Sequence, residues 1–232
     1  MAFIVLEGLD GAGKSTQAAR LQAWLRERNL AYEYLHFPRF DAPVYGDLIA
    51  RFLRGEFGAA DAVDPSLVAL IYAGDRADAA PMIRGWLAEN KTVIADRYVW
   101  SNVGYQCAKR QGAEREELRR WILGLEYGYN GIPRPDVSLF LDVPFEFTRR
   151  KLAEAREGDD RSYLQGGSDI HESSLTLQER VREVYLESAR QDEGLHVIPC
   201  TDEAGKMASP DEIFRRIVEK IAPCFEGGCC RC

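Results

Sequence analysis

The chain has 232 residues, a length that suits one large globular domain better than two small ones. Hydrophobic residues make up 46% and charged residues 29%, so the chain can build a core and disorder is not expected. The net charge of -7 argues against a protein that binds duplex nucleic acid through a broad basic face.

Membrane and secretion signals are not expected either. No segment approaches the roughly 18 consecutive apolar residues that a spanning helix needs. The apolar run at the start of the chain ends at Glu7 and has no basic residues before it, which excludes a signal peptide. We therefore expect a cytoplasmic protein without a membrane partner, in which the six cysteines are reduced thiols.

Short apolar runs alternate with longer stretches of helical periodicity along the chain. From the N-terminus, we expect a strand at 3–6, a helix at 15–29, a strand at 32–37, and helices at 44–53 and 66–89, the last broken or kinked at Pro81. Next come a strand at 92–95, helices at 101–111 and 114–127, a strand at 137–143 and a helix at 145–157. A helix at 173–191, a strand at 196–199 and a helix at 210–221 complete the series. This alternation favours an α/β fold with a parallel sheet covered on both faces.

The turn after the first strand fits the phosphate-loop pattern G-x-x-x-x-G-K-[ST]. It reads Gly8-Leu9-Asp10-Gly11-Ala12-Gly13-Lys14-Ser15-Thr16. An apolar strand precedes it and an amphipathic helix follows, as this motif requires. Backbone N–H groups of such a loop converge on phosphate oxygens, while Lys14 can reach the β- and γ-phosphates and the Ser15 hydroxyl can bind Mg²⁺. The loop therefore predicts a nucleotide site, with ATP bound by Gly8, Gly11, Ala12, Gly13, Lys14, Ser15 and Thr16.

Polar residues also follow the ends of two other strands. Asp96 ends the third strand, where a carboxylate can hold the water shell of Mg²⁺. Arg39 and Arg97 follow the second and third strands, and ligands of such sheets bind at the carboxyl ends of strands. Together with Arg76 on the third helical stretch, they provide cations for an acceptor that itself carries a phosphate. The absence of an N-K-x-D motif weakens the interpretation as a GTPase.

These motifs resemble the thymidylate kinase family. The loop 8–16, Phe37-Pro38-Arg39 and Asp96-Arg97-Tyr98 occur in the family's order, and Ser101-Asn102 and Tyr105-Gln106 follow as they do there. The stretches 141–144 and 169–172 also fit bacterial and archaeal members. The resemblance implies a three-layer phosphate-loop kinase fold with a five-stranded parallel sheet of order 2-3-1-4-5. It further implies one kinase domain over 1–222 with a lid at about 149–172, a homodimer, and transfer of a phosphoryl group from ATP to dTMP.

The resemblance also implies roles for single residues. Asp10 should contact the deoxyribose 3′-hydroxyl and position the acceptor phosphate, which Arg39 and Arg97 should hold. Tyr72 should stack on thymine, Arg76 should read the carbonyl edge of the base, and Asn102 should contact the base. Four further roles are implied: Phe37 and Ser101 in the substrate pocket, Tyr105 against the ribose 2′ position, and Arg150 on adenine.

Some thymidylate kinases carry an arginine inside the phosphate loop, where this chain has Gly11 and Ala12. We therefore expect the lid to supply the missing catalytic cation, with Arg161 as the first candidate and Arg156 as the alternative. The tail 223–232, with Cys229, Cys230 and Cys232, is expected to be flexible and is not explained by the family.

Rival functions remain at this point. They are a deoxynucleoside kinase, a kinase of another pyrimidine monophosphate, and a nucleotide-binding protein without catalysis. Three acceptor-side arginines favour a monophosphate over a nucleoside. Intact Asp10, Lys14, Ser15 and Asp96 argue against lost catalysis. The sequence leaves the preference between dTMP and dUMP open.

Overall fold

The computed structural model describes residues 1–59, 62–153 and 175–225. Five parallel strands form its sheet in the order β2-β3-β1-β4-β5, which confirms the predicted order. The strands are β1 (Phe3–Gly8), β2 (Tyr32–His36), β3 (Thr92–Asp96), β4 (Val137–Asp142) and β5 (Leu195–Pro199). In register, Val5 of β1 lies beside Ala95 of β3 on one side and Ser138 of β4 on the other. The carboxyl ends of these strands therefore meet at one edge of the sheet.

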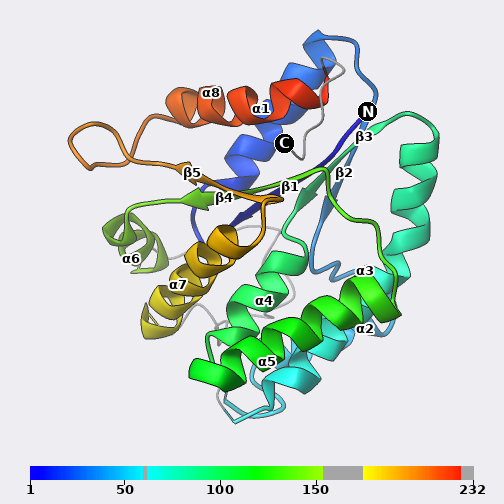
Figure 1. Cartoon of the computed structure of the whole chain (residues 1–232), viewed down its shortest axis with the longest axis vertical. Coiled ribbons are helices and arrows are strands. Elements are labelled where there is room, and N and C mark those ends of the chain that lie inside the picture. Colours follow the sequence, from blue (N-terminus) through cyan, green and yellow to red (C-terminus); the bar gives the residue numbers. More distant parts are fainter. Residues whose placement is uncertain (60–61, 154–174, 226–232) are drawn as a thin grey trace.

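Helices lie on both sides of the sheet (Figure 1). On one side α1 (Lys14–Glu27) packs against α8 (Pro210–Ile221). On the other side are α3 (Pro65–Ala88), α4 (Val99–Cys107), α5 (Gly112–Leu123) and α7 (Leu175–Gln191), with α2 (Tyr45–Leu53) packed on α3. Helix α6 (Phe145–Ala153) follows β4, a π-helical stretch (Gly124–Tyr129) follows α5, and a 3-10 turn (Ala222–Cys224) follows α8.

The central strand is apolar on both faces because helices cover both. In β1, Phe3 and Val5 belong to the core formed with α3, α4, α5 and α7, whereas Ile4 and Leu6 belong to the core formed with α1 and α8. A strand that is buried on both faces has no polar alternation, which is why a continuous apolar run indicated it in the sequence.

Helix α3 is continuous through Pro81, so the predicted break there is wrong. Proline removes one hydrogen-bond donor from the helix, and the Pro81 residue itself is exposed. Ala79, Ala80 and Ile83 around it are buried in the core. Packing of both halves of the helix against the same core stabilises it more than the missing hydrogen bond weakens it.

Several other boundaries differ from the prediction. Helix α4 begins at Val99 rather than at 101, and the helix predicted over 114–127 changes to π-helical geometry at Gly124. The parts of the predicted helices at 154–157 and 173–174 lie outside the described residues. Most of the predicted lid and the tail from 226 also lie outside them.

The described cysteines differ in state. Cys107 and Cys200 are buried free thiols, as expected for small residues that pack in a core. Cys224 is disulfide-bonded, so the expectation of reduced thiols is wrong at this position.

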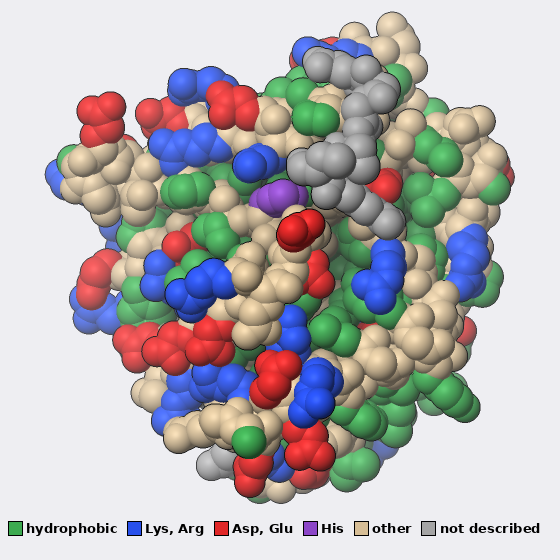
Figure 2. All heavy atoms as spheres, viewed as in Figure 1, with side chains coloured by type: hydrophobic (Ala, Val, Ile, Leu, Met, Phe, Trp, Pro, Cys, Tyr) green, Lys and Arg blue, Asp and Glu red, His purple; other side chains and the backbone are tan. Residues whose placement is uncertain are grey.

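The surface carries both signs of charge. On the face shown in Figure 2, lysine and arginine side chains alternate with aspartate and glutamate.

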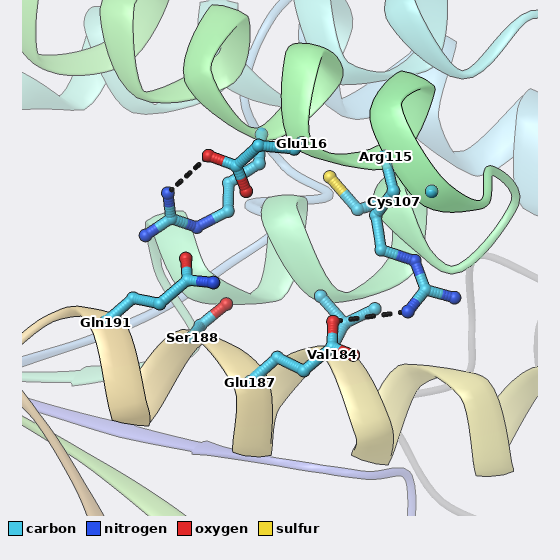
Figure 3. Close-up of a pocket in the computed structure, with 9 residues that line it drawn as sticks. Cys107, Arg115, Glu116, Val184, Glu187, Ser188 and Gln191 are labelled. Carbon is cyan, nitrogen blue, oxygen red and sulfur yellow. Dashed lines mark hydrogen bonds and ion pairs between the residues drawn. The ribbon is translucent and has the colours of Figure 1, made fainter.

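Beside α4, a cavity of about 140 Å³ lies between α5 and α7 (Figure 3). Arg115 and Arg119 line it, and each pairs with a glutamate, Glu187 and Glu116 respectively. None of the predicted site residues lines this cavity.

The helices in the described ranges are too short or too polar to cross a membrane.

A fully buried carboxylate connects β1 to two helices below the strand ends. The Oε1 atom of Glu7 accepts hydrogen bonds from the backbone N–H groups of Tyr98 at 2.9 Å and Ser101 at 3.3 Å. Its Oε2 atom accepts from the Ser101 hydroxyl at 2.6 Å and the Tyr185 hydroxyl at 2.8 Å. Because the residue before α4 provides no side-chain cap, Glu7 caps this helix from the sheet. Burial raises the pKa of Glu7, and these hydrogen bonds oppose that rise.

Replacing Glu7 by alanine should strongly destabilise the fold, because the donors on Tyr98, Ser101 and Tyr185 would stay buried without their acceptor. The expected loss in free energy of unfolding is about 2–4 kcal/mol, measured by urea denaturation. Glu33→Ala on β2 is the matched control, because Glu33 pairs with Lys91 at the surface and should matter much less. Equal losses in the two variants would contradict the role of Glu7.

Candidate active site

The carboxyl ends of β1, β2 and β3 bring the predicted polar residues together. Asp10 follows β1, Arg39 follows β2, and Asp96 and Arg97 lie at the end of β3. The backbone N–H of Arg97 donates to the Leu6 carbonyl at 2.8 Å, so the start of the Asp96-Arg97 turn is fixed against β1. This is the edge at which the sequence predicted the site.

The phosphate loop presents backbone donors. Gly11 and Gly13 have φ of 75° and 84°, in the left-handed region that favours glycine. Helix α1 begins at Lys14, and no side chain caps its first turn. Its N–H groups are thus available for an anion, and the helix dipole favours negative charge there.

The Lys14 ammonium group lies over this loop. Its Nζ donates to the carbonyl of Leu9 at 2.9 Å and to that of Gly8 at 3.3 Å. Burial, together with the positive charge of Arg97, lowers the pKa of Lys14 to about 8. A phosphate ligand would therefore stabilise the charged form of Lys14 and extend it to higher pH.

Ser15 and Asp96, the residues predicted to bind Mg²⁺, lie side by side. The Ser15 hydroxyl donates to Oδ2 of Asp96 at 3.5 Å, and Nδ1 of His36 lies 3.7 Å from the same oxygen. Oδ1 of Asp96 is buried and has no hydrogen-bond partner. Although burial opposes its charge, the hydrogen bond with His36 and the charge of Lys14 lower the pKa of Asp96. An ionised carboxylate with an unpaired oxygen beside a hydroxyl fits a hydrated Mg²⁺ ion.

Asp10 is the centre of a second cluster. Its Oδ1 pairs with Nη2 of Arg97 at 2.6 Å, and its Oδ2 accepts from the Tyr105 hydroxyl at 2.6 Å and from Nε2 of Gln178 at 2.9 Å. Burial opposes the charge of Asp10, but Arg97, Lys14 and these hydrogen bonds together hold its pKa well below the usual range. Asp10 is therefore an ionised carboxylate at neutral pH.

Arg97 has a constrained backbone. Its φ of 68° is left-handed, which is unfavourable for a residue with a side chain. Besides pairing with Asp10, its guanidinium donates to the Gly8 carbonyl at 3.0 Å and to the Ser101 hydroxyl at 3.1 Å. Ser101, predicted as a substrate contact, here connects Arg97 to Glu7. Residues held in such conformations cluster at functional sites.

Arg39 is held by two acidic residues of α3. Its Nε donates to Asp75 at 2.8 Å and its Nη2 donates to Asp78 at 2.6 Å.

Phe37 is buried, and its ring lies 5.6 Å from that of Tyr98. Tyr72, one helical turn before Arg76 on α3, is half-buried against the apolar cluster of α2.

The two predicted base contacts share one buried partner. Arg76 donates from Nε, at 3.0 Å, and from Nη2 to the carboxylate of Glu126, which is fully buried. Nδ2 of Asn102 donates to the same carboxylate at 2.9 Å. Glu126 lies on the π-helical stretch, which had no motif to indicate it.

Sequence reasoning missed Glu7, Glu126 and Gln178. Glu7 directly precedes the phosphate loop, and a charge at the end of an apolar strand was the available signal. Gln178 lies in a helix whose pattern indicated only amphipathicity.

The lid arginines Arg156 and Arg161 lie outside the described residues. Arg150 on α6 has its guanidinium 5.4 Å from the ring of Phe147.

Comparisons with known proteins agree with this geometry. The sequence model of the family described as Thymidylate kinase matches residues 6–209. A thymidylate kinase of Mycobacterium tuberculosis is 33% identical over 190 residues, covering 82% of this chain and 86% of that protein. A probable thymidylate kinase of Thermococcus onnurineus is 31% identical over 224 residues, covering 94% and 96%. The solved thymidylate kinase of Candida albicans has the same fold, with a TM-score of 0.72 and 24% identity over 95% of this chain and 91% of that one.

A parallel sheet of this order with a phosphate loop after β1 is a phosphate-loop kinase fold, and the family match makes the chain a nucleoside monophosphate kinase. Within that class, the chain belongs to the thymidylate kinase family.

The pKa of Lys14 predicts a pH dependence of nucleotide binding. Lys14 is protonated below about pH 8 and loses its charge above it, so ADP should bind progressively more weakly there. If only the protonated form binds, the dissociation constant rises by about tenfold per pH unit above pH 8. Calorimetric titrations between pH 7 and pH 9.5 measure this dependence. Lys14→Arg keeps its charge over that range and should show no comparable weakening, whereas a pH-independent wild type would contradict the assignment.

Proposed function

We propose that the protein transfers the γ-phosphoryl group of ATP to dTMP, giving dTDP and ADP. Family membership supports this activity over that of a deoxynucleoside kinase. The observation that carries it in the structure is Arg97, which is held in a left-handed conformation between the phosphate loop and α4. A cation fixed beside the loop suits an acceptor phosphate that must approach the γ-phosphate of ATP.

On the donor side, the loop residues 8–16 bind the β- and γ-phosphates. Uncapped N–H groups of α1 and the Lys14 ammonium are proposed to bind the same anion, which keeps Lys14 charged above its pKa of about 8. Ser15 and Asp96 would hold Mg²⁺, which neutralises charge on the β- and γ-phosphates when bound. Arg150 is proposed to pack on adenine.

On the acceptor side, Arg97 and Arg39 bind the phosphate of dTMP. Both arginines have acidic partners, Asp10 for Arg97 and Asp75 and Asp78 for Arg39. A dianionic phosphate competes with these carboxylates for guanidinium donors. An oxygen of that phosphate attacks the γ-phosphorus, the bond to the bridging oxygen breaks, and ADP leaves. No general base is needed, because the attacking oxygen already carries charge.

Asp10 and Tyr105 are proposed to select the deoxyribose. The Asp10 carboxylate accepts the 3′-hydroxyl, and the Tyr105 ring lies where a 2′-hydroxyl would need space. Tyr72 is proposed to stack on thymine, with Phe37 lining the pocket and Ser101 at its floor. The Tyr105 hydroxyl donates to Asp10, so one hydrogen bond fixes both groups.

Two broader properties are also part of this proposal. A closing lid at about 149–172 supplies an arginine, Arg161, to the transferred group. The protein forms a homodimer, which is supported by the exposed apolar side chains of Leu67 and Leu70 on α3 and Trp121 on α5. The cytoplasmic location and the single kinase domain over 1–222 stay predictions from the sequence.

The choice of acceptor tests this function. With ATP and Mg²⁺, a coupled assay of ADP release should give high turnover with dTMP and little with thymidine or with the ribose form of TMP. Thymidine lacks the phosphate that Arg39 and Arg97 bind, and the ribonucleotide brings a 2′-hydroxyl against Tyr105. Equal turnover of thymidine would contradict the monophosphate assignment, and equal turnover of the ribonucleotide would contradict the role of Tyr105.

A further inference from the structure

The buried carboxylate of Glu126 determines which way the amide of Asn102 faces. Nδ2 of Asn102 has two acceptors, the Ala69 carbonyl at 3.0 Å and the Glu126 carboxylate at 2.9 Å. A carboxylate can only accept hydrogen bonds, so the NH₂ group of Asn102 must face it. The opposite orientation would put the amide oxygen against two other oxygens. The orientation of the amide is therefore fixed by its neighbours.

This orientation leaves one acceptor unused. Oδ1 of Asn102 is buried and has no hydrogen-bond partner in the part of the chain that the structure describes. An unpaired buried oxygen of this kind is unfavourable, by about 1–3 kcal/mol. It is therefore suited to a ligand that brings an N–H donor.

Glu126 orients a donor in the same way. Arg76 uses Nε and Nη2 on Glu126, and its Nη1 group makes no hydrogen bond to a described residue. Arg76 and Asn102 are both nearly fully buried, on α3 and α4. One carboxylate thus fixes a donor from α3 and an acceptor from α4.

We infer that Glu126 is the positioning residue that makes the acceptor site select an imide edge and reject an amidine edge. Thymine and uracil present a carbonyl oxygen beside an N–H group, which pairs with a donor from Arg76 and the free oxygen of Asn102. Cytosine presents an amino group beside a ring nitrogen that carries no hydrogen. The Arg76 donor would then face a donor, and the Asn102 oxygen would face an acceptor. This inference rests on the proposed function and adds to it the group that sets pyrimidine discrimination.

The position of Glu126 agrees with this role. It lies in the π-helical stretch Gly124–Tyr129, and such local widenings of a helix occur frequently at functional sites. The stretch is also held to α3 by Asn130, whose Nδ2 donates to the Ala73 carbonyl at 3.4 Å. Glu126 lies too deep to be replaced by water as an acceptor, because none of its surface is exposed.

The variant E126Q tests the inference. Glutamine can donate as well as accept, so either orientation of the Asn102 amide then keeps one partner. The ratio of kcat/KM for dTMP to that for dCMP should fall by at least about tenfold, through a higher KM for dTMP, with the KM for ATP unchanged. The ratio for dTMP to dUMP should not change, because both bases present an imide edge. E126D remains an acceptor only and should keep the dTMP to dCMP ratio.

Two further measurements make the outcome decisive. E187Q removes a carboxylate from an arginine pair outside the site and should change neither ratio. An unchanged dTMP to dCMP ratio in E126Q, or an equal fall in E126D, would overturn the inference and leave Glu126 a structural residue. If E126Q does not fold, N3-methyl-dTMP is titrated into the wild type, where binding as tight as that of dTMP would overturn it. A wild type without dTMP turnover would instead refute the proposed function.

Discussion

The carboxylate of Glu7 is the constraint on which the site depends. It lies at the end of the central strand, fully buried, where desolvation disfavours a charge. The hydrogen bonds that compensate for this come from the start of α4 and from Tyr185 of α7. Because they are needed to keep a buried charge satisfied, they fix both helices relative to β1. Ser101 donates to Glu7 and accepts from Arg97, so Glu7 also helps to fix the position of the Arg97 side chain in the site.

The three arginines of the site are each paired with a carboxylate. Arg97 pairs with Asp10, Arg39 pairs with Asp75, and Arg76 pairs with Glu126. A buried or half-buried guanidinium group without a partner is unfavourable, and each carboxylate offsets that cost. The pairs differ in exposure, because the first two are partly open to solvent and the third is not. A phosphate can compete for the open pairs, whereas the closed pair serves to orient its arginine.

The sequence was most informative where local chemistry dictates structure. A loop that binds phosphate through its backbone needs glycines at fixed positions, so loop 8–16 could be recognised from its sequence. Strands β1 and β4 could be recognised from their apolar runs, because they are buried on both faces. Pro81 misled because tertiary packing of α3 outweighs a local preference. Glu126 and Gln178 carried no signal, because their partners are 50 and 168 residues away. Such pairs depend on tertiary geometry, which no local pattern encodes.

The central claim is that Asp10 positions the acceptor while Arg97 binds its phosphate, and the turnover of Asp10→Asn tests it most directly. Asparagine has the same shape and can still accept from Tyr105 and Gln178, so the fold should be kept. It also removes the charge that competes with phosphate for Arg97, so dTMP should still bind, as calorimetry can verify. The account predicts that kcat at saturating dTMP falls by about 10² or more, as for other positioning residues. A kcat close to that of the wild type, with dTMP bound, would contradict it.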